Sequence, residues 1–383
     1  MTDTPSGALA PQIDLAQRFE RFAAMDGRDD PLYSALAALI ASRPALLALL
    51  ARAPLTQQLP VLLLAALHDR VLAGADHGLA AYYPSVGGTR APDAALAATL
   101  ERFAAHEHDA LLATLCSRNT QTNEIGRCAM LWPALQALAQ RLAPPGQALP
   151  LALFDFGCSA GLNLGVADYA YDYQTAQGPL RAGSQSPEAP RVPSVWRGAA
   201  PAALLGPARW RLAARLGVDL APLDPADPAQ ARWLQACLWP HDQQRRERLQ
   251  QALRLARARP PALEASARGL DRLAAWLDEL PAGVQPVLFN SWVLAYFDAP
   301  ALARYRQQVQ ALTLRRGLAW ISAEAVARAP LEPPPAVPAG ESPGSATLWT
   351  LHWRRADGRP CTEALGWSHP HGRWLSWLDG APA

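Results

Sequence analysis

The residues with the clearest chemical potential lie in the segment Asp155-Phe-Gly157-Cys-Ser159-Ala-Gly161. A serine held between two glycines on a tight turn can act as a nucleophile. A carboxylate followed by glycines can instead hold a polar ligand, because glycine lets backbone N–H groups approach it closely. The segment therefore predicts either covalent chemistry at Ser159 or non-covalent binding of a polar ligand.

The residues around this segment predict the elements that position it. Leu151–Phe154 is an apolar run, so residues 151–156 predict a buried strand, and residues 159–169 predict the helix that follows. Asn163 falls in the first turn of that helix. A strand, a small-residue turn and a helix N-terminus together would present backbone N–H groups to a ligand.

Strands and helices alternate along the rest of the chain. Residues 217–222 predict a strand that ends in Asp219, and Pro286–Ser291 predicts the strongest later strand. A weak strand is expected near Leu263, further strands at 318–322, 346–354, 361–367 and 371–378, and helices at 227–238, 241–257, 270–280 and 304–314. This alternation predicts an α/β fold with a Rossmann-like, doubly wound, mostly parallel sheet that binds ligands at its carboxyl edge.

The N-terminal third of the chain has a different pattern. Apolar residues recur at three- and four-residue spacing from residue 13 to 142, which is typical of helices. The Pro- and Gly-containing link at 143–150 separates this part from the strands. We therefore expect an α-helical domain over 1–145 and a ligand-binding domain over 149–383, with an inserted loop or hairpin at about 174–200.

Composition excludes several classes of function. The chain has 383 residues and a net charge of only +2, so a nucleic-acid partner is not expected. All 35 basic residues are arginines, which excludes a phosphate-binding-loop lysine and a Schiff-base lysine. The five cysteines are scattered and the paired histidines lack a third ligand, so no metal site is expected.

The same features bear on the cellular location. Scattered cysteines without a Cys-x-x-Cys pair are typical of reduced thiols in a cytoplasm. The first residues lack a basic stretch followed by an apolar one, and the apolar run Val61–Leu67 is too short to span a bilayer. We expect a cytoplasmic protein with no membrane partner.

The motif Asp155-x-Gly157-x-Ser159-x-Gly161 resembles the first nucleotide-binding loop of class I S-adenosylmethionine (SAM) methyltransferases. Gly217-Val-Asp219 looks like the second strand of that family, whose terminal acid grips the ribose hydroxyls. The resemblance implies SAM as cofactor. It also implies that Asp155, the loop residues through Asn163, and Asp219 bind it, whereas the adenine contact stays open.

A polar segment, Asn123-Glu-Ile-Gly-Arg127, heads the helix before the first strand. In the methyltransferase arrangement this helix start lies beside the loop. Asn123 and Arg127 are therefore cofactor-binding candidates, with Arg127 pairing the carboxylate of SAM. Glu124 is the candidate catalytic base. Ordinary helix capping by these residues is the competing interpretation.

Four aromatic residues and one amide complete the candidate site. Asn290 ends the fourth strand, where methyltransferases place reacting groups, and is the second catalytic candidate. Trp292 and Tyr296 follow it and could face a sulfonium through cation–π contact. Tyr82 and Tyr83 lie between helices and are candidates for lining the substrate pocket. Core packing is the alternative for all four rings.

Two other functions compete with methyl transfer to a small molecule. Gly157-x-Ser159-x-Gly161 also spells the nucleophile elbow of α/β-hydrolases, which would make the protein an esterase. About 150 helical residues precede Ser159, however, where that fold needs several strands. The other alternative is a non-catalytic SAM- or nucleotide-binding regulator. The oligomeric state stays open.

Nearly the whole chain also resembles the bacterial family catalogued as domain of unknown function 2332 (DUF2332). The residues that carry this resemblance are Leu79 to Ser85, Gln121 to Arg127, Asp155 to Asn163, Gly217 to Asp219, Trp239-Pro240 and Arg245. The resemblance implies a methyltransferase-like architecture and carries no established reaction.

Overall fold

The computed structural model describes residues 14–74, 78–144 and 146–378, and the chain divides into two compact units. The helical unit comprises the chain up to Thr122 together with Pro228–Arg246, and the sheet unit comprises Asn123–Asp227 and the chain from Glu247 onward. The first boundary thus lies before the predicted link at 143–150. The reason is that α7 (Cys128–Leu142) contacts strands β4 and β5 of the sheet.

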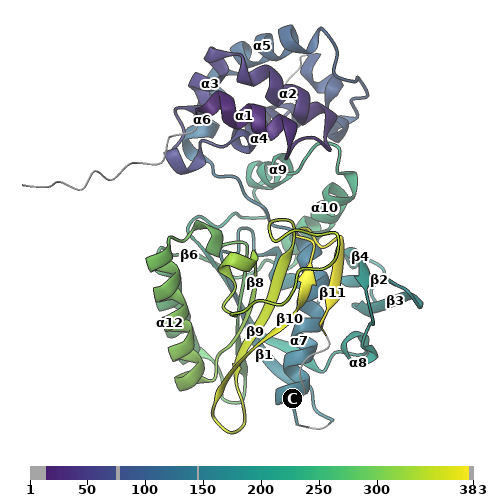
Figure 1. Cartoon of the computed structure of the whole chain (residues 1–383), viewed down its shortest axis with the longest axis vertical. Helices are drawn as coiled ribbons and strands as arrows, with labels where there is room; N and C mark the ends of the chain where they lie inside the picture. Colours follow the sequence, from purple (N-terminus) through teal and green to yellow (C-terminus); the bar gives the residue numbers. More distant parts are fainter. Residues whose placement is uncertain (1–13, 75–77, 145, 379–383) are drawn as a thin grey trace, which may run out of the picture. The chain divides into compact units, whose positions relative to one another are not determined.

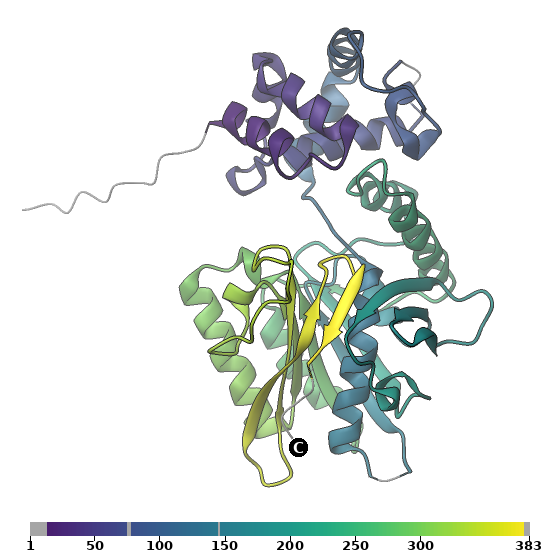
Figure 2. The same ribbon diagram turned by 45° about the vertical axis from the view of Figure 1, so that its right-hand side comes forward.

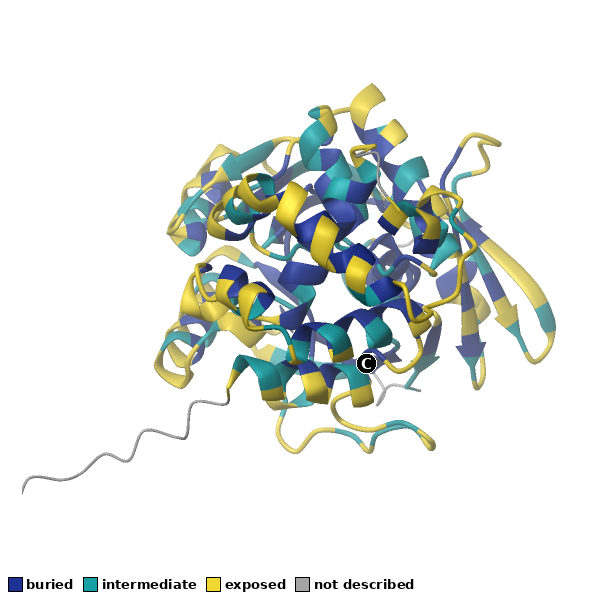
Figure 3. Cartoon of the chain, turned by 90° about the horizontal axis from the view of Figure 1, so that it is seen from above, coloured by how far each residue is buried: buried dark blue, intermediate teal, exposed yellow. Residues whose placement is uncertain are grey.

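The described residues before Leu149 form helices and turns and no strand, as the periodicity over 13–142 predicts. The helices of the helical unit are α1 (Leu15–Ala24), α2 (Pro31–Ala41), α3 (Pro44–Leu50), α4 (Pro60–Leu72), α5 (Leu96–His106), α6 (His108–Ser117) and α9 (Pro228–Ala236). Buried and exposed residues share most of the described helices, as amphipathic periodicity predicts (Figure 3), whereas α4 is buried continuously from Leu62 to Asp69. No single described helix is long and apolar enough to span a bilayer, although the bent pair α2–α3 passes that test together.

The sheet unit contains one sheet of eleven strands (Figure 1). In chain order they are β1 (Leu149–Phe156), β2 (Ala170–Thr175), β3 (Gly178–Gly183), β4 (Arg191–Arg197), β5 (Trp210–Asp219), β6 (Leu263–Ala265), β7 (Gln285–Ser291), β8 (Ala319–Glu324), β9 (Thr347–Arg354), β10 (Pro360–Ser368) and β11 (Trp374–Trp377). Their order across the sheet is β3-β2-β4-β11-β10-β9-β8-β7-β1-β5-β6. The prediction of an α/β protein with an N-terminal helical region is confirmed, and the sheet is mixed but mostly parallel.

The parallel part of the sheet brings the ends of β1, β5 and β7 to one edge. Asp155 of β1 pairs with Gly217 of β5, and Phe156 pairs with Asn290 of β7. Strand β8 continues the parallel order next to β7. The chain order across these strands reverses between β1 and β7, since β5 and β6 lie on one side of β1 and β7 and β8 on the other.

Helices cover both faces of this sheet (Figure 2). On one face, α11 (Gly269–Glu279) and α12 (Ala299–Arg316) bury a core with Phe154, Leu216, Leu288 and Trp320. On the other face, α7 packs Trp132 against Trp210 at the start of β5, with ring centroids 5.0 Å apart. The remaining helices of this unit are the short α8 (Ala202–Leu205) and α10 (Gln243–Ala258), which begins in the helical unit.

One expectation about the segment after β1 is wrong. The helix predicted over 159–169 is only the 3₁₀ turn η5 (Leu162–Gly165). For residues 174–200 the sequence predicts a loop or a hairpin, and the structure has β2 and β3 paired as an antiparallel hairpin, with β4 joining β2 to extend the sheet. Tyr169, Tyr171 and Tyr173 are buried and donate their hydroxyl protons to backbone carbonyls, and this period-two pattern favours strand over helix.

Candidate functional site

The loop that follows β1 is held in an unusual backbone conformation. Gly157, Ser159 and Gly161 all have positive φ, at 75°, 55° and 66°. A Cβ atom on Gly157 would lie 2.5 Å from Val293 Cγ2, so only glycine fits there. A non-glycine residue such as Ser159 in this region is strained, and such strain concentrates at functional sites.

Asp219 supports the strained loop directly. It ends β5, next to β1, and its Oδ2 accepts a hydrogen bond from the Ser159 N–H at 2.9 Å. Its Oδ1 accepts one from the Ala221 N–H at 3.1 Å. The sequence places this carboxylate at the correct edge of the sheet. The structure adds that the carboxylate contacts the loop itself, with no ligand-sized gap between them.

Asp155 is the group with the most perturbed surroundings in the loop. Its side chain is only 2% exposed, and its Oδ2 atom has no hydrogen-bond partner in the structure. Burial raises the pKa of its carboxyl to about 7, the negative charge of Asp219 adds to this rise, and the positive charge of Arg127 opposes it. A buried carboxyl with a raised pKa and an unused oxygen is typical of a functional site.

The polar segment before α7 lies against the loop, as the sequence predicts. Asn123 Oδ1 accepts a hydrogen bond from the Leu162 N–H at 3.0 Å. The Cys128 thiol donates to Asn163 Oδ1 at 3.5 Å. Asn123 and Asn163 therefore join this segment to η5, and both belong to the candidate site as positioning residues.

Arg127 and Glu124 occupy the turn η4 (Ile125–Arg127) and its cap. Arg127 donates from Nε to the Pro370 carbonyl at 3.0 Å and from Nη1 to the Ser291 carbonyl at 3.4 Å. Glu124 Oε1 accepts from the Gly126 N–H at 2.7 Å and from Arg248 Nη2 at 3.3 Å. The contacts of Glu124 are those of a cap and an ion pair, and its assignment as a base stays a prediction.

The loop after β7 contains the second strained residue, Trp292, with φ 55°. Glu324, at the end of β8, holds this loop by accepting hydrogen bonds at Oε1 from the N–H groups of Val293 (3.0 Å) and Leu294 (3.2 Å). Its Oε2 is buried without a partner, and burial raises the pKa of its carboxyl to about 7. Ser159 and Trp292, the non-glycine residues with positive φ, thus follow neighbouring strands at one edge of the sheet.

Asn290 lies in the core beneath this loop. It is fully buried, and its Nδ2 donates to Glu324 Oε1 at 2.7 Å. Its Oδ1 accepts from Trp320 Nε1 at 2.5 Å and from the Tyr305 hydroxyl at 3.3 Å. The prediction of a catalytic Asn290 therefore finds no support, because both ends of the amide are engaged in the core.

The four aromatic candidates belong to different units. Trp292 is half-buried and donates from Nε1 to Thr347 Oγ1 at 2.8 Å, whereas Tyr296 is 73% exposed. Tyr82 and Tyr83 belong to the helical unit and are buried there. Tyr82 donates to Asp93 at 2.7 Å, and Tyr83 stacks on His68 with centroids 5.2 Å apart. Packing within the helical unit accounts for both tyrosines.

The sequence interpretation missed Glu324 and Arg248. Glu324 follows the buried strand predicted at 318–322, so an acid just past a strand was the available signal. Arg248 carried no signal, because it is one of several arginines on a polar helix. Among the described residues there is no cluster of three or more histidine, cysteine or acidic side chains that could hold a metal ion.

The chain belongs to the family described as "uncharacterized protein conserved in bacteria" (DUF2332), whose model matches residues 16–377. The match spans both units, and it confirms the family resemblance of the sequence. No curated protein and no solved structure matches the chain.

Proposed function

We propose that the edge of the sheet formed by the ends of β1, β5 and β7 binds S-adenosylmethionine, and that the protein transfers its methyl group to a small molecule. The observation that carries this proposal is Asp155, whose buried Oδ2 has no partner in the protein. A buried acceptor without a partner destabilises the fold by about 1–3 kcal/mol, and a ligand that donates to it would remove that penalty.

The strand order supports a ligand at this edge. The five adjacent parallel strands β6, β5, β1, β7 and β8 come third, second, first, fourth and fifth among themselves along the chain, which is the order of Rossmann-like, doubly wound proteins. In such sheets ligands bind outside the carboxyl ends of the strands where the order reverses, here between β1 and β7. Asp155 lies at that position.

The residues at this edge have the charges and hydrogen-bonding groups that the ammonium, carboxylate and ribose of SAM require. Asp155 could accept from its ammonium group, and the glycines of the loop leave space for close approach of the backbone. Arg127, whose charge is felt at Asp155, would orient the carboxylate. Each Asp219 oxygen accepts one backbone hydrogen bond and keeps lone pairs for a ribose hydroxyl.

SAM itself supplies an activated methyl group on a sulfonium, so the protein needs mainly to align the acceptor and exclude water. Trp292 and Tyr296 follow β7 at this edge and could stabilise the sulfonium. Because η5 replaces the expected helix, the loop amides rather than a helix N-terminus would meet the ligand.

Ligand binding to the purified chain tests the proposal. We expect SAM and S-adenosylhomocysteine, but not NAD, to raise the melting temperature, since ligand at a hundred times its Kd adds about 2.7 kcal/mol. Asp155→Asn should weaken SAM binding at least about tenfold, or by about 1.4 kcal/mol. Asp357→Asn is the matched control, because this turn residue accepts only from the Arg359 N–H.

Calorimetric affinities unchanged in Asp155→Asn would contradict the proposal, as would the absence of any SAM binding. Binding without production of S-adenosylhomocysteine in the presence of candidate acceptors would instead favour the non-catalytic regulator.

A hydrolase is the second candidate, because Ser159 combines a strained backbone with a buried, unpartnered Oγ. Against it, the Oγ has no hydrogen bond to a histidine, and no described strand precedes β1. Ser159→Ala decides between the two. On the hydrolase interpretation it abolishes ester hydrolysis and fluorophosphonate labelling, whereas on the methyltransferase interpretation it weakens SAM binding at most about tenfold.

A further inference from the structure

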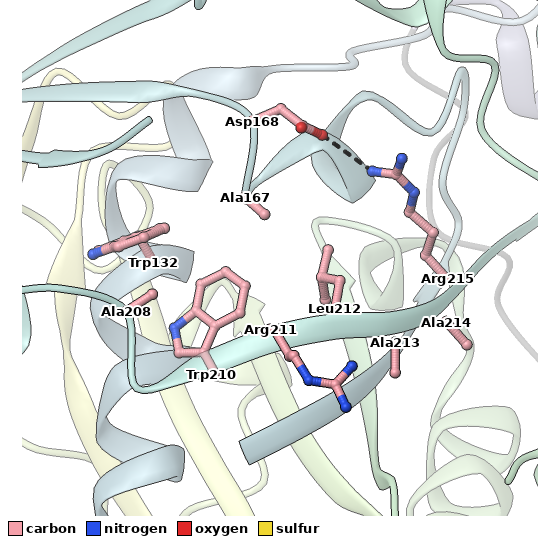
Figure 4. Close-up of a pocket in the computed structure, with 10 residues that line it drawn as sticks. All are labelled: Trp132, Ala167, Asp168, Ala208, Trp210, Arg211, Leu212, Ala213, Ala214 and Arg215. Carbon is pink, nitrogen blue, oxygen red and sulfur yellow. Dashed lines mark hydrogen bonds and ion pairs between the residues drawn. The ribbon is translucent and has the colours of Figure 1, made fainter. Parts of the chain in front are cut away.

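A cavity of about 420 Å³ lies in the sheet unit, at the opposite end of β5 from Asp219. Its walls come from α7, the end of the 3₁₀ turn region and the first half of β5 (Figure 4). Arg215, at one side of the cavity, lies four residues before Asp219, or roughly 13 Å along the strand. The volume falls in the range of small-molecule sites.

The cavity exists because of two departures from regular structure. First, the helix that the sequence predicts after β1 is only η5, so the face of β5 beside α7 is incompletely covered. Second, β5 contains a bulge, since Leu151 pairs with Leu212 while Ala152 pairs with Ala214. The bulge shifts the alternation of side chains between the two faces of β5. The side chain of Arg215 therefore lies on the same face of the strand as those of Trp210 and Leu212.

One side of the cavity is aromatic and apolar. The indoles of Trp132 and Trp210 lie with their centroids 5.0 Å apart and their planes at 59°. Leu212 points into the same space, and Ala167 faces it from across the cavity (Figure 4). Such walls suit a flat, apolar body, because aromatic rings pack well in edge-to-face and offset arrangements.

The other side carries a positive charge with unused donors. Arg215 donates from Nη1 to the Leu164 carbonyl at 3.1 Å and to Asp168 Oδ2 at 3.2 Å. Its Nε and Nη2 have no partner within the described part of the chain. Asp168 is already shared, because Arg259 also donates to it at 2.9 Å. Because Arg215 and Arg259 share the single carboxylate of Asp168, this side of the cavity has a net positive charge.

We propose that this cavity is a second binding site, separate from the loop at Asp155, for a small aromatic carboxylate. The aromatic body would pack against the wall that Trp132 and Trp210 form together. The carboxylate would receive hydrogen bonds from Nε and Nη2 of Arg215, the geometry in which guanidinium groups bind carboxylates. This inference does not depend on SAM binding, because it uses none of the residues at the carboxyl edge.

The probe 2-naphthoate tests the site, with neutral 2-naphthylmethanol as its uncharged counterpart. We expect calorimetry to give at least tenfold tighter binding of the carboxylate than of the alcohol. In ¹H–¹⁵N spectra of the tryptophan indoles, 2-naphthoate should shift the resonances of Trp132 and Trp210, each assigned by its loss in the Trp→Phe variant. The other eleven of the thirteen tryptophans should shift little.

Matched variants test the positive charge of Arg215 and the volume of the cavity separately. Arg215→Gln should weaken 2-naphthoate binding about tenfold. Arg211→Gln is the matched control, because it removes the same charge from a side chain on the other side of the β5 ribbon (Figure 4). This control should change the affinity less than about twofold. Ala167→Phe should fill the cavity and abolish binding while the affinity for SAM stays unchanged. Equal affinity for acid and alcohol, unshifted Trp132 and Trp210 resonances, or displacement of 2-naphthoate by SAM would each overturn the proposal.

Discussion

Asp155 and Glu324 place two buried carboxyl groups with a pKa of about 7 at the ends of β1 and β8. Each has one oxygen without a hydrogen-bond partner. Above pH 7 both are charged in the folded protein, in an environment that disfavours the charge because it is buried. Glu324 holds the loop after β7 through two backbone hydrogen bonds. The binding role proposed for Asp155 would account for its burial at a cost in stability.

Replacing Asp155 should therefore stabilise the protein in a pH-dependent way. The carboxyl loses its proton near pH 3.9 when unfolded and near pH 7 when folded, so its penalty is absent in acid and grows up to pH 7. Asp155→Asn should raise the free energy of unfolding more at pH 8 than at pH 5, by about 2–3 kcal/mol. Urea unfolding at both pH values measures this difference. A gain in stability that is equal at the two pH values would contradict it.

At the scale of elements, the sequence was informative wherever one pattern dominated. The helical character of the N-terminal segment was predicted from its apolar periodicity, and the ends of β7 and β9 were predicted within one residue. The helix predicted after β1 was wrong. Gly161, Leu162 and Leu164 suit a helix locally, but the Tyr169 hydroxyl donates a hydrogen bond to the Leu162 carbonyl. Such a contact across seven residues leaves no signal in local periodicity.

The sequence likewise predicted the positions of some candidate site residues and not of others. Asp155 and Asp219 could be placed, because each ends a buried strand and parallel strands end at one edge. Asn290 satisfied the same rule, yet its side chain turns into the core, where Trp320 and Tyr305 take its oxygen. The direction of a side chain at a strand end depends on packing partners that are distant in the sequence.

The loop itself offers an element-scale prediction. Gly157→Ala introduces both backbone strain and a methyl group 2.5 Å from Val293 Cγ2, whereas Gly358→Ala introduces only the strain, since nothing lies within 4 Å of its Cβ. We expect Gly358→Ala to lower the free energy of unfolding by about 1–2 kcal/mol. Gly157→Ala should lower it by a further 1–3 kcal/mol and abolish SAM binding.

Thermal unfolding of the two variants, with SAM calorimetry, measures the difference. Equal losses of stability with SAM binding retained would show that the contact with Val293 is unimportant.

At the scale of the whole molecule, buried groups in the two units make opposite contributions to the pH dependence of stability. His68 of the helical unit is buried, its Nε2 accepts from the Ser85 hydroxyl (2.7 Å) and its Nδ1 donates to the Ala236 carbonyl (3.1 Å). Burial lowers its pKa to about 4. The unfolded chain takes up this proton near pH 6.5, so the helical unit loses stability as the pH falls from 6.5 to 4. Asp155 and Glu324 of the sheet unit instead contribute less stability as the pH rises toward 7.

Hydrogen exchange followed by mass spectrometry tests this contrast, after correction for intrinsic exchange rates. Between pH 7 and pH 4 the peptides of the helical unit should lose up to about 3 kcal/mol of protection. Peptides from β1 and β8 should gain protection over the same range. Changes in protection of the same sign in both sets of peptides would contradict the pKa shifts of His68, Asp155 and Glu324.

The discontinuity of the helical unit has a consequence for biosynthesis. Helix α9 packs on α4, and it supplies Trp233, which donates to the Asn119 carbonyl, and Arg232, which pairs with Asp69. The ribosome must add roughly 120 residues after Thr122 before this unit is complete, which takes roughly 6–25 s at 5–20 residues per second. During that time the nascent chain carries six helices with the α9-binding surface of α4 uncovered, while β1 and β5 are already emerging.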